Sequence, residues 1–140
     1  MNIKRLLLAT LAIWLFGIAY LMLTCAGFFS WIYTIPPIIW KAPADMMTAG
    51  NMIGSNLMGL TATFLFVLVY ALLYKALSNK GFKKGLYYGF LVFLIGPFSG
   101  FASMPFYMTI ANVYVIYAII SFFVKYLIMG AIVGAIYKRD

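Results

Sequence analysis

Four long apolar runs constrain this chain more than any other feature. They cover about residues 6–33, 47–77, 82–103 and 107–137, and none of them contains an acidic residue. Each is at least as long as the roughly 20 residues that an α-helix needs to cross the core of a bilayer. Of the 140 residues, 66% are hydrophobic and 9% are charged, and a water-soluble domain of this size has too much surface to bury that apolar fraction. The sequence therefore predicts an integral membrane protein.

The apolar runs are expected to form helices. Lipid offers no hydrogen-bond partner to the backbone, and the chain is too short for a closed barrel with a polar lumen. We predict an all-α, polytopic membrane four-helix bundle that forms a single transmembrane domain over residues 1–140. The link between spans one and two contains Pro36 and Pro37, which cannot continue a helix, so this loop is expected to be irregular. All five prolines fall in the same half of the bundle as this loop, where we also expect a cavity and a kink at Pro97.

The distribution of basic residues predicts the orientation in the membrane. The chain has ten Lys and Arg residues against two acidic residues, a formal net charge of +8. Eight of the ten basic residues lie at the two termini and around the link between the second and third spans. The first loop, on the opposite side of the bundle, carries only Lys41, which Asp45 offsets. The positive-inside rule therefore predicts that both termini lie in the cytoplasm. We expect the membrane to be a bacterial cytoplasmic membrane. The eight basic residues assigned to the cytoplasmic side are Lys4, Arg5, Lys75, Lys80, Lys83, Lys84, Lys138 and Arg139.

The positions of these charges also indicate partners. The basic residues flank apolar runs and form no stripe on a water-facing element, so we expect no nucleic-acid partner. The expected partners are membrane lipids and either a second copy of the chain or another membrane protein.

Lys125 is the basic residue that the positive-inside rule does not explain. It precedes the end of the fourth run by twelve residues, which places it about 18 Å from the membrane boundary at 1.5 Å per residue. A lysine at the centre of a span costs about 2.5–3.5 kcal/mol on insertion scales. Because the spans contain no carboxylate, Lys125 must be neutral, solvated in a cavity, or bound to an anion, a lipid headgroup or a neighbouring chain. Such a residue is a functional candidate by default.

Polar side chains predict a pocket that ends at Lys125. Helical spacing places three polar residues on the face of Lys125, and the second and fourth spans begin with further polar residues. If these faces converge, they line an outward-facing polar pocket. The alternative is that Ser, Thr and Asn hydrogen-bond to nearby backbone and only hold helices together. The hypothetical ligand-binding residues are Lys125, Ser121, Tyr114, Tyr117, Asn112, Asn51, Ser55 and Asn56.

Several residue types needed for catalysis are missing from the sequence. The chain has no histidine, one cysteine and no acidic residue in a span. These absences exclude a Ser-His-Asp triad, a bis-histidine haem and a zinc or iron–sulfur centre. We therefore expect no enzymatic activity, no catalytic residue, no metal site and no cofactor.

Glycine pairs at four-residue spacing recur in the spans. Such pairs let helix backbones approach closely, either within one bundle or between copies in a homo-oligomer. The pairs are Gly50 and Gly54, Gly85 and Gly89, Gly96 and Gly100, and Gly130 and Gly134.

The segments 85–91 (GLYYGFL) and 125–138 (KYLIMGAIVGAIYK) resemble small bacterial four-span membrane proteins grouped as domains of unknown function. The segment 31–37 (WIYTIPP), followed by Trp40 and Lys41, corresponds to an aromatic and proline-containing segment after their first span. The resemblance implies the four-span topology and supplies no catalytic residue.

Two functional classes follow from the sequence. The first is a small multi-pass protein without catalytic chemistry that acts as an accessory or scaffold subunit or as a self-associating bundle. The alternative is a small carrier or channel for an anionic or polar solute, with Lys125 as the binding charge in an outward-facing pocket.

Overall fold

A computed structural model describes residues 2–78 and 80–137 of the chain. Throughout these residues the regular structure is helical, and no strand is found in them. Two α-helices continue into short π-helices, and two 3₁₀ turns lie where the chain reverses direction. In chain order the elements are α1 (Ile3–Leu21), η1 (Met22–Phe28), η2 (Ser30–Thr34), α2 (Pro43–Met46), α3 (Ala49–Leu73), α4 (Gly81–Phe93), η3 (Leu94–Phe98), α5 (Ser99–Ser103), η4 (Met104–Phe106) and α6 (Asn112–Ile136).

Four helical stretches are long and apolar enough to cross a membrane. They cover Ile3–Phe28, Ala49–Leu73, Gly81–Phe106 and Asn112–Ile136, with 25 or 26 residues each. This confirms the expectation of an all-helical chain with four long apolar helices, and their length and composition are those of a multi-pass membrane protein.

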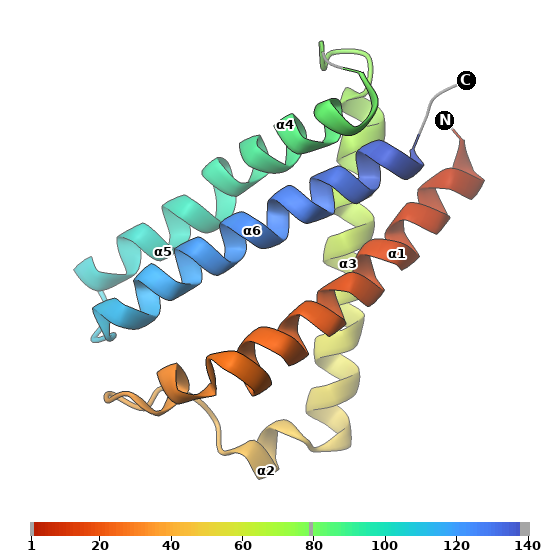
Figure 1. Ribbon diagram of the computed structural model, residues 1–140. Helices are drawn as coiled ribbons and strands as arrows, with labels where there is room; N and C mark the ends of the chain where they lie inside the picture. Colours follow the sequence, from red (N-terminus) through yellow and green to blue (C-terminus); the bar gives the residue numbers. More distant parts are fainter. Residues whose placement is uncertain (1, 79, 138–140) are drawn as a thin grey trace.

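The helices form two ends of different character (Figure 1). The start of α1, the end of α6 and the α3–α4 link all lie at one end, which we call the terminal end. α2 and η4 lie at the other end, which we call the loop end. α4 and α5 run beside α6, α1 packs on another side of α6, and α3 crosses behind α1 and diverges from it towards the loop end (Figure 1).

The charged residues follow this division of the molecule. Lys4 and Arg5 in α1, the lysines of the α3–α4 link and those of the first turn of α4 all lie at the terminal end, and Lys41 lies near α2 at the loop end. Lys138 and Arg139, which also count in the charge bias, lie outside the described residues.

The helix bounds differ from the expected runs at several points. The run expected over residues 6–33 is regular α-helix only as far as Leu21, and then continues as η1 and η2. The second helix begins at Ala49 because Thr48 is extended (ψ 145°). The fourth begins at Asn112, five residues later than expected, because Ala111 is extended (ψ 126°). Hydrophobicity alone does not distinguish these loop residues from helix, since the loops are also apolar.

The hydrophobic core lies towards the terminal end. Its fully buried side chains include Ile13 of α1, Val67 and Tyr70 of α3, and Val133 of α6. The hydroxyl of Tyr88 in α4 donates a hydrogen bond to the Phe66 carbonyl oxygen at 2.7 Å, which joins α4 to α3. The loop-end half of α3, by contrast, is mostly exposed.

The packing of α4 against α6 depends on four glycines. A Cβ on Gly134 would lie 2.8 Å from the Gly81 carbonyl oxygen, and one on Gly130 would lie 3.0 Å from the Gly89 Cα. A Cβ on Gly85 would overlap the Gly130 carbonyl oxygen. These two glycine pairs therefore serve close packing within one bundle, as one of the two sequence interpretations expected.

The loop end contains the irregular helical segments, as the prolines predict. Pro97 lies inside the π-helix η3, where its missing N–H interrupts the α-helical hydrogen-bond pattern of the third span. The other π-helix, η1, contains Thr24, whose hydroxyl donates to the Tyr20 carbonyl oxygen at 2.8 Å. Both π-helices therefore lie in the loop-end halves of their spans.

Candidate functional site

Lys125 lies near the middle of α6 and lines two cavities. The larger cavity, about 900 Å³, extends from Lys125 to the segment around α2, and we call it the loop-end cavity. The smaller one, about 570 Å³, lies among α1, α3, α4 and α6, and we call it the mid-bundle cavity. Both volumes fall in the range of about 300–1,000 Å³ that is typical of small-molecule sites.

Aromatic side chains form much of the wall of the loop-end cavity. Tyr33 and Trp40, from the segment after the first span, pack against Tyr114 of α6 with ring-centroid distances of 5.9 and 5.2 Å. The rings of Tyr33 and Trp40 also contact each other edge-on, at 5.1 Å. Edge-to-face pairs of this kind add about 0.5–1.5 kcal/mol each to apolar burial. The apolar loop therefore folds back on α6 and closes one side of the cavity.

A sulfur atom and a second hydroxyl lie near the Tyr33 hydroxyl. The Cys25 sulfur lies 2.9 Å from the Tyr33 hydroxyl oxygen, and the buried hydroxyl of Tyr117 makes no hydrogen bond of standard geometry. Burial, followed by the neighbouring Cys25 and Tyr117, raises the pKa of the Tyr33 hydroxyl above its usual value. This wall thus presents the protonated hydroxyl of Tyr33, and no carboxylate lines the cavity.

A polar contact joins α1 to α6 one turn before Lys125. The Tyr20 hydroxyl donates to the Ser121 carbonyl oxygen at 2.8 Å and lies 3.1 Å from the Ser121 hydroxyl oxygen. Ser121 therefore lines the loop-end cavity and at the same time helps to hold two helices together.

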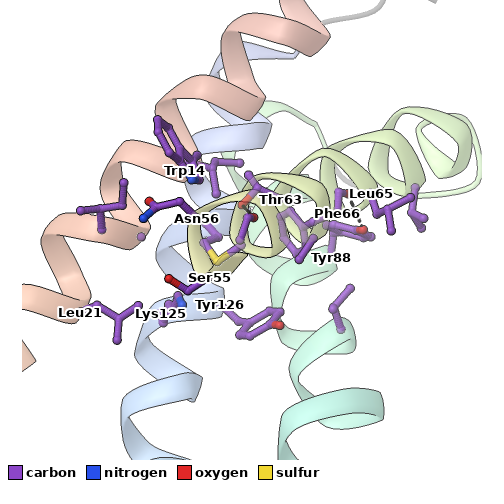
Figure 2. A pocket seen from close by; sticks show the side chains of 18 of the residues that line it. Trp14, Leu21, Ser55, Asn56, Thr63, Leu65, Phe66, Tyr88, Lys125 and Tyr126 are labelled. Atoms are coloured by element: carbon purple, nitrogen blue, oxygen red, sulfur yellow. Dashed lines mark hydrogen bonds between the residues drawn. The ribbon is translucent and has the colours of Figure 1, made fainter. Parts of the chain in front are cut away.

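The mid-bundle cavity brings polar groups from two helices towards Lys125. Figure 2 shows Trp14 on α1, Ser55 and Asn56 on α3, and Lys125 on α6 pointing into the space among these helices. Ser55 donates to the Met52 carbonyl oxygen at 3.0 Å, and the Asn56 amide nitrogen donates to the same oxygen at 2.8 Å. Each side chain therefore uses one donor within α3, as the structural alternative expected, and both still line the cavity.

Lys125 has no acidic partner in the described part of the chain. Its Nζ lies 5.4 Å from the centroid of the Phe122 ring, and no carboxylate is within ion-pair distance of it there. Asp45, the acidic residue of the described ranges, is exposed and lines neither cavity. The charged residues that line the two cavities are Lys125 and Lys41, which are both basic.

Two of the eight hypothetical site residues lie away from both cavities. The Asn51 amide nitrogen donates to the Asp45 carbonyl oxygen at 2.6 Å, and Lys41 donates to the Asn51 amide oxygen at 3.4 Å. Asn51 thus holds the loop to the start of α3, and Asn112 is an exposed residue at the start of α6. The other six line a cavity: Tyr114, Tyr117 and Ser121 the loop-end cavity, Ser55 and Asn56 the mid-bundle cavity, and Lys125 both.

Sequence reasoning missed several residues of the cavity walls. Tyr33 and Trp40 are residue types that are common at membrane–water interfaces. Only the return of the loop onto α6 places them beside Tyr114. Trp14 lines the mid-bundle cavity but has no polar neighbour in the sequence that would single it out. The aromatic and proline-containing loop was the available signal for the first two residues.

Comparisons with protein-family models, curated proteins and solved structures find no significant match to this chain.

Proposed function

We propose that this multi-pass membrane protein is a small carrier or channel for an anionic solute, with Lys125 as the binding charge. The observation that carries the proposal is the position of Lys125, which lines both cavities and has no carboxylate partner in the described residues. A cation in the middle of a span is unfavourable unless water or an anion compensates it. A bound anion would supply the missing counter-charge.

The neutral donors around Lys125 support an anion rather than a cation. The hydroxyl of Tyr117 lines the loop-end cavity, and the amide of Asn56, which keeps one N–H beyond its bond to the Met52 carbonyl, lines the mid-bundle cavity. The single hydroxyl proton of Ser55 is already donated to that carbonyl. Hydrogen bonds from neutral donors to an anion are strengthened by its charge, and no carboxylate in either lining competes for them. A cation would instead meet the charges of Lys125 and Lys41.

The difference between the two ends supports an outward-facing arrangement. The loop-end cavity lies on the side that the positive-inside rule assigns to the exterior, and the buried core lies on the cytoplasmic side of Lys125. Carriers commonly place their binding site near the bilayer midplane, which is where the length of α6 puts Lys125. The orientation with both termini inside a bacterial cytoplasmic membrane belongs to this proposal.

Uptake into proteoliposomes tests the role of Lys125. Wild-type protein and the Lys125→Met variant are reconstituted, and uptake of phosphate, acetate, chloride and octyl phosphate is measured. We expect the variant to fold and to lose uptake of the transported anion. Lys75→Met, which removes an exposed lysine at the terminal end, is the matched control and should retain it. Equal uptake by wild type and Lys125→Met would contradict the proposal.

A second candidate is an accessory or self-associating bundle without catalytic chemistry. The observation that favours it is the open space in front of Gly50 and Gly54 on α3 and of Gly96 and Gly100 on the third span. A second copy or another membrane protein could approach these faces closely. In that case Gly54→Leu should change the stoichiometry measured by light scattering in detergent, and Lys125→Met should leave it unchanged.

A further inference from the structure

We infer that the solute bound at Lys125 is an amphiphile with an anionic head group and one apolar chain. The inference rests on the proposed function, because it needs Lys125 to be the site of the negative charge. It adds the chemical class of the ligand, which follows from the apolar lining of the loop-end cavity and from the position of Lys125 in the walls of both cavities.

The loop-end cavity has room for a chain and a surface that favours one. Its volume of about 900 Å³ greatly exceeds what a small inorganic anion fills. Its walls are mostly aromatic and aliphatic, with Trp40, Phe101 and Phe122 among the largest side chains. Apolar surface of this kind gains about 25 cal/mol per Å² when a hydrocarbon displaces water from it. A small anion would leave this surface unused, whereas an alkyl chain would cover it.

The mid-bundle cavity is also lined mostly by apolar side chains, but it holds polar groups beside Lys125. Ser55 and Asn56 point into it beside Lys125 (Figure 2). Because Lys125 lines both cavities, one molecule can place a negative head group at the Lys125 ammonium and its chain among the aromatic rings. Ser55 and Asn56 both lie in the loop-end half of α3, where they are exposed.

Charge favours this occupant over an uncharged lipid. Lys41 is the other charged residue of the loop-end lining, and it lies in the exposed segment before α2. Two basic residues along one cavity attract an anionic head group and give no advantage to a neutral one. A neutral amphiphile of the same chain length is therefore the sharpest comparison.

Titration calorimetry of the purified full chain in a non-ionic detergent tests the inference. The probes are inorganic phosphate, butyl phosphate, octyl phosphate and octanol. Each buried methylene is worth about 0.8 kcal/mol, or roughly fourfold in affinity, so octyl phosphate should bind at least about tenfold more tightly than butyl phosphate. Octanol should bind at least about tenfold more weakly than octyl phosphate, because it lacks the charge that Lys125 binds.

Two variants test whether the alkyl chain of the ligand lies in the loop-end cavity. Ser30 is exposed and lines that cavity, so Ser30→Trp should fill part of it and weaken octyl phosphate binding without touching Lys125. Ser78→Trp makes the same change at an exposed position of the terminal end and should bind like wild type. The chain-length comparison uses the wild-type protein alone, so it still decides the question if Ser30→Trp fails to fold.

The outcomes separate this inference from the proposed function. If inorganic phosphate binds as tightly as octyl phosphate and Lys125→Met abolishes both, the amphiphile is overturned and the anion site stands. If octanol binds as tightly as octyl phosphate, or Ser30→Trp and Ser78→Trp behave alike, the inference is also overturned. If none of the anions binds, the inference and the proposed function fail together.

Discussion

Two lysine side chains of this protein, Lys84 and Lys125, are buried or half-buried, and their contacts differ. Lys84 is only 8% exposed, and its ammonium donates to the Tyr74 carbonyl oxygen at 2.8 Å and lies 4.0 Å from the centroid of the Tyr74 ring. It therefore satisfies a backbone group at the C-terminal end of α3. Lys125 has no such partner in the described residues and faces cavities instead. In the sequence Lys84 is simply one of eight topogenic charges, because its partner lies ten residues away across a link.

The role of Lys84 predicts a loss of stability in Lys84→Met. The substitution removes a charged hydrogen bond and leaves the Tyr74 carbonyl without that donor, which we expect to cost about 1.5–3 kcal/mol. Denaturation by SDS, followed by circular dichroism, measures the free energy of unfolding. The matched variant Lys83→Met changes an exposed lysine and should shift it far less. Equal shifts for the two variants would show that the Tyr74 contact contributes nothing.

Tyr33 predicts a pH dependence of stability. Burial, with Cys25 and Tyr117, raises its pKa above the usual value of about 10. Above about pH 10 the unfolded state therefore releases this proton first, and the free energy of unfolding falls as the pH rises. We expect the thermal midpoint to fall less steeply from about pH 9 to about pH 11 in Tyr33→Phe than in wild type. Parallel pH profiles for the two proteins would argue against it.

At the scale of elements, the glycine pairs divide into two groups. Gly85, Gly89, Gly130 and Gly134 lie where α4 and α6 touch, whereas Gly96 and Gly100 face open space. The spacing is identical in both groups, so the sequence predicts close approach without saying which helices approach each other. Only the arrangement of the four spans distinguishes the two groups.

Alanine substitutions should separate these two groups. In Gly134→Ala the new Cβ would lie 2.8 Å from the Gly81 carbonyl oxygen, so the backbones must move apart, at about 1–3 kcal/mol. In Gly100→Ala the Cβ meets open space, and the better helix propensity of alanine favours the folded state by up to about 1 kcal/mol. Thermal unfolding in detergent should therefore move in opposite directions for the two variants, and a common direction would contradict the assignment.

The sequence predicts local properties of the elements better than their contacts. The four spans follow from hydrophobicity and length, and the irregular loop end follows from the prolines, because both effects act within a few residues of their cause. The return of Tyr33 and Trp40 onto α6 depends on contacts across some eighty residues, which no spacing rule supplies. Likewise, helical periodicity aligned Tyr114, Tyr117 and Ser121 with Lys125, but the sequence could not say that Asn51 serves the loop.

The whole molecule is closed at the terminal end and hollow at the loop end. The core joins α1, α3, α4 and α6, the mid-bundle cavity borders its residues Ile13, Phe66, Tyr88 and Met129, and the loop-end cavity lies beyond it. The basic residues gather at the closed end and the prolines at the hollow end. We interpret this arrangement as a binding protein that faces the exterior.

Cysteine labelling tests the predicted orientation. On a Cys25→Ser background, Met108→Cys places a thiol at the loop end and Ser78→Cys places one at the terminal end. Both positions are exposed. In intact cells a membrane-impermeant maleimide should label the first variant, and the second should react only after permeabilisation. The reverse pattern would invert the topology.

Native mass spectrometry from a mild non-ionic detergent tests whether Lys125 holds a bound anion. Wild-type protein and Lys125→Met are isolated from the same membranes, and the masses and charges of retained small molecules are compared. We expect wild type to retain an anionic adduct and Lys125→Met, with the same subunit stoichiometry, to lack it. The same adduct on both proteins, or a wild-type protein without any, would contradict the role of Lys125.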